Sequence, residues 1–273
     1  MTTAIRTTRR PAAATIRVLL AIVYIVPMLW IVLTSFKDRN DVVASALFFT
    51  PTLDAYERAL SPALFTALTQ SIVIATVSTA IVLIVAIPAA YGLARVRGLA
   101  PTLVLSALII LQMVPQTATV IPLFQVFGGL RILDTNLAII LADAALMTPF
   151  AIILLRPFFR SVPTALEEAG AVDGASGFRV FRSIVLPVVR NGIATTGTLV
   201  FLIVWGEFLY AVNFFLTPAN YPLSALLAQQ VSSYGVNWPG LMALGVITSI
   251  PILILFAFTY RLLKEGLTVG AVK

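Results

Sequence analysis

Cysteine and histidine are both absent from the 273-residue sequence. Their absence excludes disulfide bonds, thiol catalysis, zinc sites built from Cys and His, and Ser-His-Asp triads. Charge is also scarce: only 11% of the residues are charged, against about 25% in a typical soluble domain. So few charged side chains could not cover the surface of a soluble globule. A soluble enzyme, a disordered chain and a DNA-binding domain are therefore all poor interpretations.

Apolar residues are abundant instead. They make up 60% of the chain, and the mean hydropathy is +1.02. Apolar stretches of about 20 residues, long enough to cross a bilayer as a helix, recur six times along the sequence. They lie at about 18–36, 69–94, 99–124, 135–155, 191–216 and 241–260. The sequence therefore predicts an all-α integral membrane protein with six transmembrane helices, forming a single domain over residues 1–273.

The basic residues orient these six helices. With the N-terminus in the cytoplasm, 14 Lys and Arg residues lie inside and 4 lie outside, which accounts for all 18. The positive-inside rule therefore places both termini, the loop 161–190 and the tail 261–273 in the cytoplasm. This topology explains the net charge of +7 without a nucleic-acid partner. A cleaved signal peptide is the alternative for the first apolar run, but its 19 residues exceed the usual length of about 7–15.

The loop 161–190 has more pattern than a simple connection between helices needs. Its first part favours a short helix, with Ser161 as a possible cap, and Asp173-Gly174 is a turn signal, because Gly tolerates positive φ. Phe178, Phe181 and Ile184 are spaced by three, which places them on one face of a second short helix. Such a helix–turn–helix could dock into a groove on a soluble partner or lie on the lipid interface. Physical arguments alone leave both alternatives open.

A resemblance to a known family favours the first alternative. Glu168-Ala169-Gly170, then Gly174, then Ile184-x-Leu186-Pro187 resembles the EAA motif of ABC importer permeases, with complete spacing across 20 residues. The departure is Gly170, where the family usually has Ala; it costs about 1 kcal/mol of helix propensity and could loosen the first short helix. Further blocks in the same order resemble the maltose-type carbohydrate branch. They include Ser35-Phe36-Lys37, Ala89-Ala90-Tyr91 with Arg95, Ile121-Pro122-Leu123-Phe124, Pro149-Phe150-Ala151 and Gly266-Leu267-Thr268.

The resemblance implies a permease with the type I ABC importer fold in the bacterial inner membrane, and a transport subunit rather than an enzyme. It implies a second, different permease, two copies of a cytoplasmic ATPase and an extracytoplasmic substrate-binding protein as partners. The chain has no G-x-x-x-x-G-K-[ST] loop, so ATP and Mg²⁺ are expected on the ATPase, and neither a cofactor nor a metal on this chain.

The same resemblance assigns contacts with the ATPase to two segments. The coupling-loop candidates are Glu168, Ala169, Gly170, Asp173, Gly174, Ala175, Phe178, Phe181, Ile184, Leu186 and Pro187. The C-terminal candidates are Gly266, Leu267, Thr268, Gly270 and Lys273. We expect Glu168, Asp173 and Gly174 to set the shape of the loop, and the two Phe residues to fill a groove on the ATPase.

A few polar residues within the spans are candidates for the solute pathway. An acid in a membrane span costs about 2.5–3.5 kcal/mol and is a functional candidate by default. A carboxylate beside an aromatic ring also suits a sugar, which offers hydroxyls and C–H faces. The candidates are Gln112, Gln116, Asp143, Trp205, Glu207 and Tyr210. The alternative is structural: hydrogen bonds between helices, or aromatic anchoring at the interface.

Two other function classes are weaker. A self-contained secondary transporter needs inverted repeats and ion ligands at the membrane midplane, and the sequence has no convincing internal repeat. An intramembrane enzyme without His or Cys is limited to a Ser/Lys or two-Asp site. The favoured prediction is a permease subunit of an ATP-driven importer for a sugar or sugar-like solute.

Overall fold

The structure, a computed structural model, describes residues 11–233 and 235–271, with side chains over 14–233 and 235–260. Most of this chain is helical, which confirms the all-α prediction. It forms two compact units. The first contains the residues up to Ser61 together with Gln230–Ser249, and the second contains Pro62–Gln229 and the residues from Ile250 onward.

The first unit holds one long apolar helix and several short elements. They are α1 (Pro11–Thr34), α2 (Arg39–Val43), α3 (Asp54–Ala59), β1 (Val231–Ser232), β2 (Gly235–Val236) and the start of α13 (Trp238–Ala271). The two strands pair antiparallel, with Val231 opposite Val236. Over residues 14–34, the described side chains of α1 are almost all exposed, as expected for a helix whose surroundings are lipid or another subunit.

Lys37 fixes the segment that follows α1. Its side chain is buried, donates a hydrogen bond of 2.5 Å to the carbonyl of Ala46, and lies over the rings of Trp30 and Phe49 at 4.4 and 5.0 Å. A cation over aromatic faces is stabilised by the ring quadrupole. The positive-inside count places Lys37 outside, and these contacts give its charge a structural role there.

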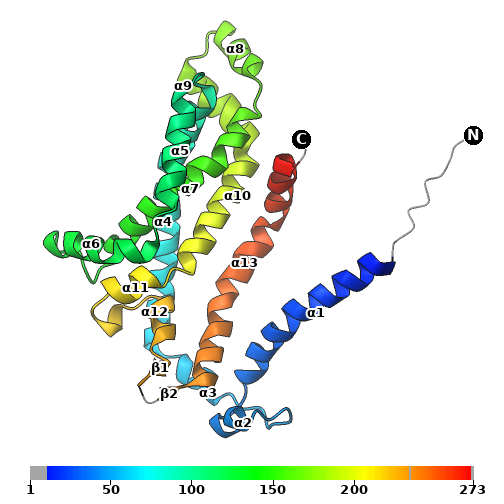
Figure 1. The fold of residues 1–273 in the computed structure, drawn as a ribbon, viewed down its shortest axis with the longest axis vertical. Coiled ribbons are helices and arrows are strands. Elements are labelled where there is room, and N and C mark those ends of the chain that lie inside the picture. Colours follow the sequence, from blue (N-terminus) through cyan, green and yellow to red (C-terminus); the bar gives the residue numbers. More distant parts are fainter. Residues whose placement is uncertain (1–10, 234, 272–273) are drawn as a thin grey trace, which may run out of the picture. The chain divides into compact units, whose positions relative to one another are not determined.

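The second unit carries the other helices. In chain order they are α4 (Pro62–Arg95), α5 (Ala100–Gln112), α6 (Gln116–Gly129), α7 (Asn136–Arg160), α8 (Thr164–Val172), α9 (Gly177–Val180), the π-helix η1 (Phe181–Val185), α10 (Leu186–Trp205), α11 (Leu209–Phe214), the 3-10 turn η2 (Pro218–Asn220) and α12 (Leu223–Ala228). Helices α8 and α9 lie at one end of this unit, and α11 and α12 lie at the other (Figure 1). Helices α8 and α9 lie in the loop 161–190 that the charges place in the cytoplasm, and α12 lies in the segment after the fifth predicted span.

Helices α4, α7 and α10 form the core of this unit by close approach of small residues. The buried positions of α4 include Ala67, Ala75, Ala86 and Ala90, spaced so that they share one face. On α10, a Cβ at Gly197 would lie 3.0 Å from Leu83 Cδ1. Small residues are the usual means by which membrane helices approach closely, because lipid supplies no hydrophobic drive between them.

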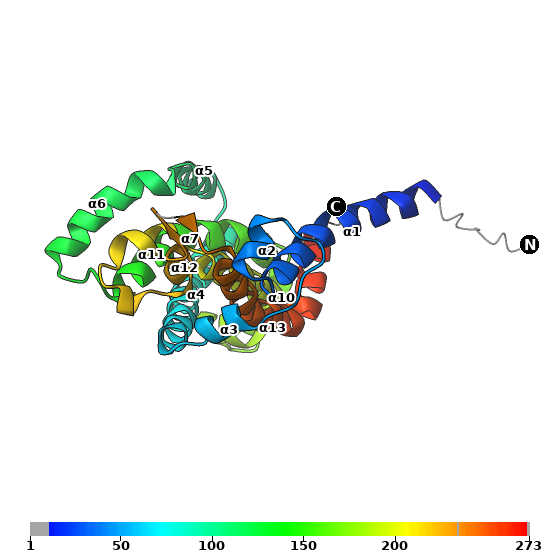
Figure 2. The same ribbon diagram turned by 90° about the horizontal axis from the view of Figure 1, so that it is seen from below.

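The third predicted span, 99–124, is not one helix. Five described helices are long and apolar enough to cross a membrane, and a sixth crossing would require α5 and α6, which meet at 87°. Figure 2 shows α6 turned away from α5, and the Phe127 ring of α6 contacts the Phe214 ring of α11. The break falls at Met113–Pro115, where Pro115 has an extended backbone (ψ 133°). A residue before Pro is disfavoured in the helical region, so Val114 does not continue α5, which ends at Gln112.

The fifth predicted span, 191–216, also differs from the structure at both ends. The helix begins within the predicted loop, because α9, η1 and α10 follow one another without a break from Gly177 to Trp205. The wider η1 turn ends just before Pro187, a residue that lacks the N–H needed for a regular helical bond. The helix then stops at Gly206, and α11 is a separate short helix.

Candidate functional site

The predicted coupling loop is a helix–turn–helix at the end of the second unit. Helix α8 begins after Pro163, whose backbone is extended, and Ser161 donates to the carbonyl of Phe158 at 2.7 Å. The sequence had suggested Ser161 as the cap of α8. In the structure Ser161 instead bonds to the end of α7 and does not cap α8. The turn after α8 is at Gly174, with φ +78°, a conformation that Gly adopts at little cost.

Gly170 packs tightly against the start of the next helix. A Cβ at this position would lie 2.7 Å from Ile184 Cδ1 and 3.1 Å from Val180 Cγ2. The expectation that Gly170 loosens α8 is therefore wrong. The helix is continuous, and the missing methyl group lets it approach the following helix more closely.

The three residues spaced by three do not share one environment. Phe178 is 71% exposed, whereas the ring of Phe181 contacts that of Tyr91 at 4.8 Å and Ile184 lies against Gly170. The prediction of one common apolar face is therefore wrong, because only Phe178 is exposed and the wider turn at 181–185 changes the helical register between Phe181 and Ile184. Of the three side chains, only that of Phe178 is exposed enough to be buried against a partner.

The remaining loop candidates divide between surface and interior. Leu186 is half-buried at the start of α10. The exposed candidates, all open to a partner, are Glu168, Ala169, Asp173, Gly174 and Pro187, and Ala175 is half-buried. Val172, which sequence reasoning missed, is 88% exposed beside the turn. Its apolar side chain at the tip of a polar loop was the available signal.

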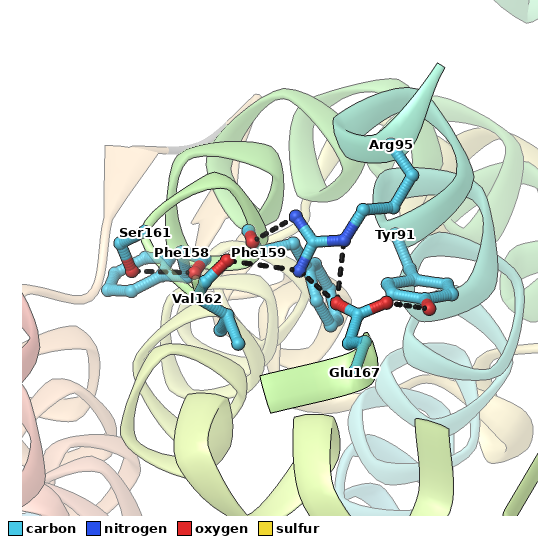
Figure 3. Close-up of polar contacts among 7 residues, drawn as sticks. All are labelled: Tyr91, Arg95, Phe158, Phe159, Ser161, Val162 and Glu167. Carbon is cyan, nitrogen blue, oxygen red and sulfur yellow. Dashed lines mark hydrogen bonds and ion pairs between the residues drawn. The ribbon is translucent and has the colours of Figure 1, made fainter. Parts of the chain in front are cut away.

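A salt bridge that sequence reasoning missed joins α8 to the transmembrane helices (Figure 3). Arg95 at the end of α4 donates from Nε to Glu167 Oε1 at 2.7 Å, and its Nη2 forms an ion pair with the same oxygen. Tyr91 donates its hydroxyl to Glu167 Oε2 at 2.7 Å. In the sequence, Glu167 stands beside the EAA-like motif and Arg95 lies 72 residues earlier. Neither residue alone indicates that they pair.

The pathway candidates gather near the other end of the unit. Glu207 lies between α10 and α11, where its carboxylate accepts the backbone N–H groups of Tyr210 and Ala211 at 2.7 and 3.1 Å. Gln116 Nε2 donates to the same carboxylate at 2.9 Å. The Tyr210 hydroxyl is 2.7 Å from Thr119 Oγ1. Glu207 and Tyr210 are therefore close through a helix cap and not as neighbours on one helix face.

Asp143 lies next to this group on α7. It is 1% exposed, and its Oδ2 has no hydrogen-bond partner in the described chain. In one regular helix, Gln112 and Gln116 would lie on the same face, but the bend between α5 and α6 separates them, and Gln112 donates to the Leu146 carbonyl at 2.7 Å. Gln116 joins the Glu207 group instead.

Two cavities border these residues. The larger, about 390 Å³, is lined mostly by apolar side chains, with Gln112, Thr119 and Tyr210 as its polar lining. The smaller, about 10 Å³, is bordered by Trp205 and Glu207 and has room for about one water. The larger cavity is of the size that small ligands occupy.

Outside the membrane spans, Asp134 ties two loops of this unit together. It accepts the N–H groups of Leu216 and Thr217, both at 3.0 Å, and the Thr217 hydroxyl at 2.6 Å. Burial acts to raise the pKa of Asp134, but the hydrogen bonds from Thr217, Leu216 and Asn220 outweigh it and hold this pKa below its usual value. The loop before α7 is thereby fixed to the segment after α11.

The C-terminal candidates fall where the structure says little. Gly266, Leu267, Thr268 and Gly270 belong to α13, but their side chains lie outside the described set. Lys273 lies outside the described residues. Their contact with an ATPase remains a prediction.

Comparison with known proteins defines the class to which this fold belongs. Residues 83–269 match the family described as "Binding-protein-dependent transport system inner membrane component". The chain belongs to this family. It is thus a permease component of ABC importers, a multi-pass protein of the inner membrane and a transport subunit rather than an enzyme.

Individual relatives agree along nearly the whole length. The chain is 35% identical over 272 residues to the "Probable ABC transporter permease protein y4oR" of Sinorhizobium fredii, covering 98% of this chain and 97% of the relative. It is 31% identical to the "Sulfoquinovosyl glycerol transport system permease protein SmoH" of Agrobacterium fabrum, covering 90% and 88%. A chain of a bacterial ABC transporter "involved in the import of the acidic polysaccharide alginate" has a TM-score of 0.78 at 21% identity, covering 96% and 99%. That last likeness concerns the fold.

Proposed function

We propose that the chain is the permease subunit of an ATP-driven importer for a sugar or sugar-like solute. A relative of 31% identity is named for sulfoquinovosyl glycerol, and a structural neighbour for alginate; both are saccharides. A second, different permease completes the pathway, and an extracytoplasmic binding protein delivers the solute. Two cytoplasmic ATPases hydrolyse ATP, so ATP and Mg²⁺ bind there and not on this chain.

The α8–turn–α9 segment carries this proposal. It projects from one end of the second unit (Figure 1) and exposes two apolar side chains, Val172 and Phe178. Apolar side chains at the tip of an exposed loop favour burial against a partner. Closure of the two ATPases would press on this tip and displace α8 and α9. The C-terminal residues 266–273 would add a second contact.

The cavity of about 390 Å³ is the proposed place of solute contact on this chain. Gln112, Thr119 and Tyr210 offer hydrogen bonds and an aromatic ring to a sugar, among apolar walls. The Glu207 carboxylate already accepts three hydrogen bonds from the chain itself. Its proposed role is therefore to position Tyr210 and Gln116, with Trp205 and Asp143 packed behind it.

Cross-linking tests the coupling contact directly, since the chain has no native Cys. Val172→Cys is the test variant, and Phe48→Cys, 95% exposed and expected on the outer side, is the matched control. A maleimide–benzophenone reagent attached to the thiol of Val172→Cys should, on irradiation, join this chain to the ATPase in the purified complex and stop its ATP hydrolysis. Equal cross-linking from Phe48→Cys, or none from Val172→Cys, would contradict the proposal.

A further inference from the structure

The backbone leaves the helical conformation at both ends of α8. Pro163 before it is extended, and Gly174 after it has a positive φ. Of the nine residues of α8, seven are exposed; Glu167 is half-buried and Gly170 is buried. These two are three residues apart and so lie on one face of the helix. Glu167 and Gly170 are therefore the positions at which side-chain packing joins α8 to the rest of the second unit.

At Glu167 the connection leads to two transmembrane helices at once. While Arg95 pairs with Glu167, its Nη1 donates to the Phe159 carbonyl at 2.9 Å and its Nη2 to the Val162 carbonyl at 3.3 Å. Figure 3 shows the guanidinium between the carboxylate and these carbonyls. One side chain from α4 thus joins the coupling helix α8 to the C-terminal end of α7.

The pair is also sheltered from water. The side chains of Arg95 and Glu167 are 20% and 17% exposed. The ring of Tyr91 lies beside them, with its centroid 5.4 Å from the guanidinium and 5.7 Å from the Phe159 ring. Charged pairs of restricted exposure resist screening better than surface pairs, whose net contribution is small. Both carboxylate oxygens are used, which fixes the direction of the side chain.

We propose that Arg95, Glu167 and Tyr91 are positioning residues that transmit the displacement of α8 to α4 and α7 as one body. The proposal rests on the ATPase coupling described above and names where the motion enters the membrane helices. Helix α7 carries Asp143 and part of the large cavity. Rotation or tilt of α4 with α7 would therefore change access to the solute cavity. The planar fork of Arg is needed, because Lys cannot reach the carboxylate and both carbonyls in the same geometry.

A cysteine reporter tests this transmission without knowledge of the solute. Ala145 on α7 is exposed and lines the large cavity. In Ala145→Cys, the rate of labelling by N-ethylmaleimide would be compared between the nucleotide-free complex and the complex trapped with ATP and vanadate. The variants Arg95→Lys, Glu167→Gln and Tyr91→Phe would then be placed in this background. The exposed Arg97→Lys at the same membrane end serves as the control.

We expect the variants Arg95→Lys and Glu167→Gln to reduce the ATP-dependent change in labelling rate by about tenfold, the factor equivalent to about 1.4 kcal/mol. Their complexes should still hydrolyse ATP. Tyr91→Phe, which removes a single hydroxyl, should give a smaller loss, and Arg97→Lys none. The exchange Arg95→Glu with Glu167→Arg should restore part of the response.

An unchanged labelling response in Glu167→Gln and Tyr91→Phe would overturn the proposal. So would a lower melting temperature with a normal labelling response, because that is the behaviour of a salt bridge that only stabilises. If Arg95→Lys fails to assemble, Tyr91→Phe still decides, since it leaves the ion pair in place. A parent complex whose labelling ignores ATP would instead refute the proposed function itself, so the two failures are distinguishable.

Discussion

Substitution of Gly174 isolates the contribution of one backbone conformation to the coupling loop. Gly174 has φ +78°, and no atom lies within 4 Å of a Cβ built on it. An added Cβ therefore meets no steric neighbour, and the cost of Gly174→Ala comes from the positive φ alone. For Gly174→Ala we expect the free energy of local unfolding of the loop to fall by about 1–2 kcal/mol, which is the cost of a left-handed backbone conformation for an L-residue. Gly174→Val should cost more, because it is β-branched, and Gly174→Asn less, because Asn tolerates this region.

The assay is hydrogen exchange of the backbone amides of α8 in the purified complex. A loss of 1–2 kcal/mol raises the open population of a locally unfolding segment by about 5- to 30-fold. The exchange rates should therefore rank Val above Ala above Asn. Equal rates for Asn and Ala would refute the reasoning, because side-chain size and not φ would then govern the turn.

Three further predictions concern the second unit. Because Asp134 has a lowered pKa, its contribution to stability is present above the ordinary Asp value and is lost as pH falls through the folded value; Asp134→Asn should abolish this acid-dependent part of the melting temperature. Glu207→Ala removes the cap of α11 and should cost about 0.5–2 kcal/mol, with Glu207→Gln milder; melting curves would show no difference if the cap were unimportant. The buried Leu223 N–H donates to Ser71 Oγ at 2.8 Å, and Ser71→Ala removes this acceptor. We expect the free energy of unfolding to fall by about 1–3 kcal/mol, measured by the same melting curves. A melting temperature equal to that of the parent would contradict it.

The features that the sequence predicts well are local or repeated. Long apolar runs identify the spans, since a bilayer demands them irrespective of the fold. The Asp173-Gly174 pair marks the turn, because positive φ is a property of one residue. The resemblance to a permease family, carried by several blocks in order, is confirmed by the match over residues 83–269.

The features that the sequence predicts poorly depend on contacts between distant residues or on the exact geometry of a helix break. Arg95 and Glu167 are 72 residues apart, and nothing in either local segment specifies the other. Pro115 marks an interruption, but a kink and an 87° break have the same sequence signature. Phe181 contacts the ring of Tyr91 on α4, and the wider turn at 181–185 changes the register before Ile184, whereas a spacing of three assumes regular helix throughout.

The central claim is that this chain works only as part of an ATP-driven complex. Affinity purification of the chain in mild detergent, followed by mass spectrometry and reconstitution in liposomes, tests it most directly. We predict recovery of an ATPase in two copies with a second permease, and ATP hydrolysis that responds to the binding protein. Recovery of this chain alone, with solute movement in liposomes that needs no ATP, would contradict the claim and favour a self-contained secondary transporter.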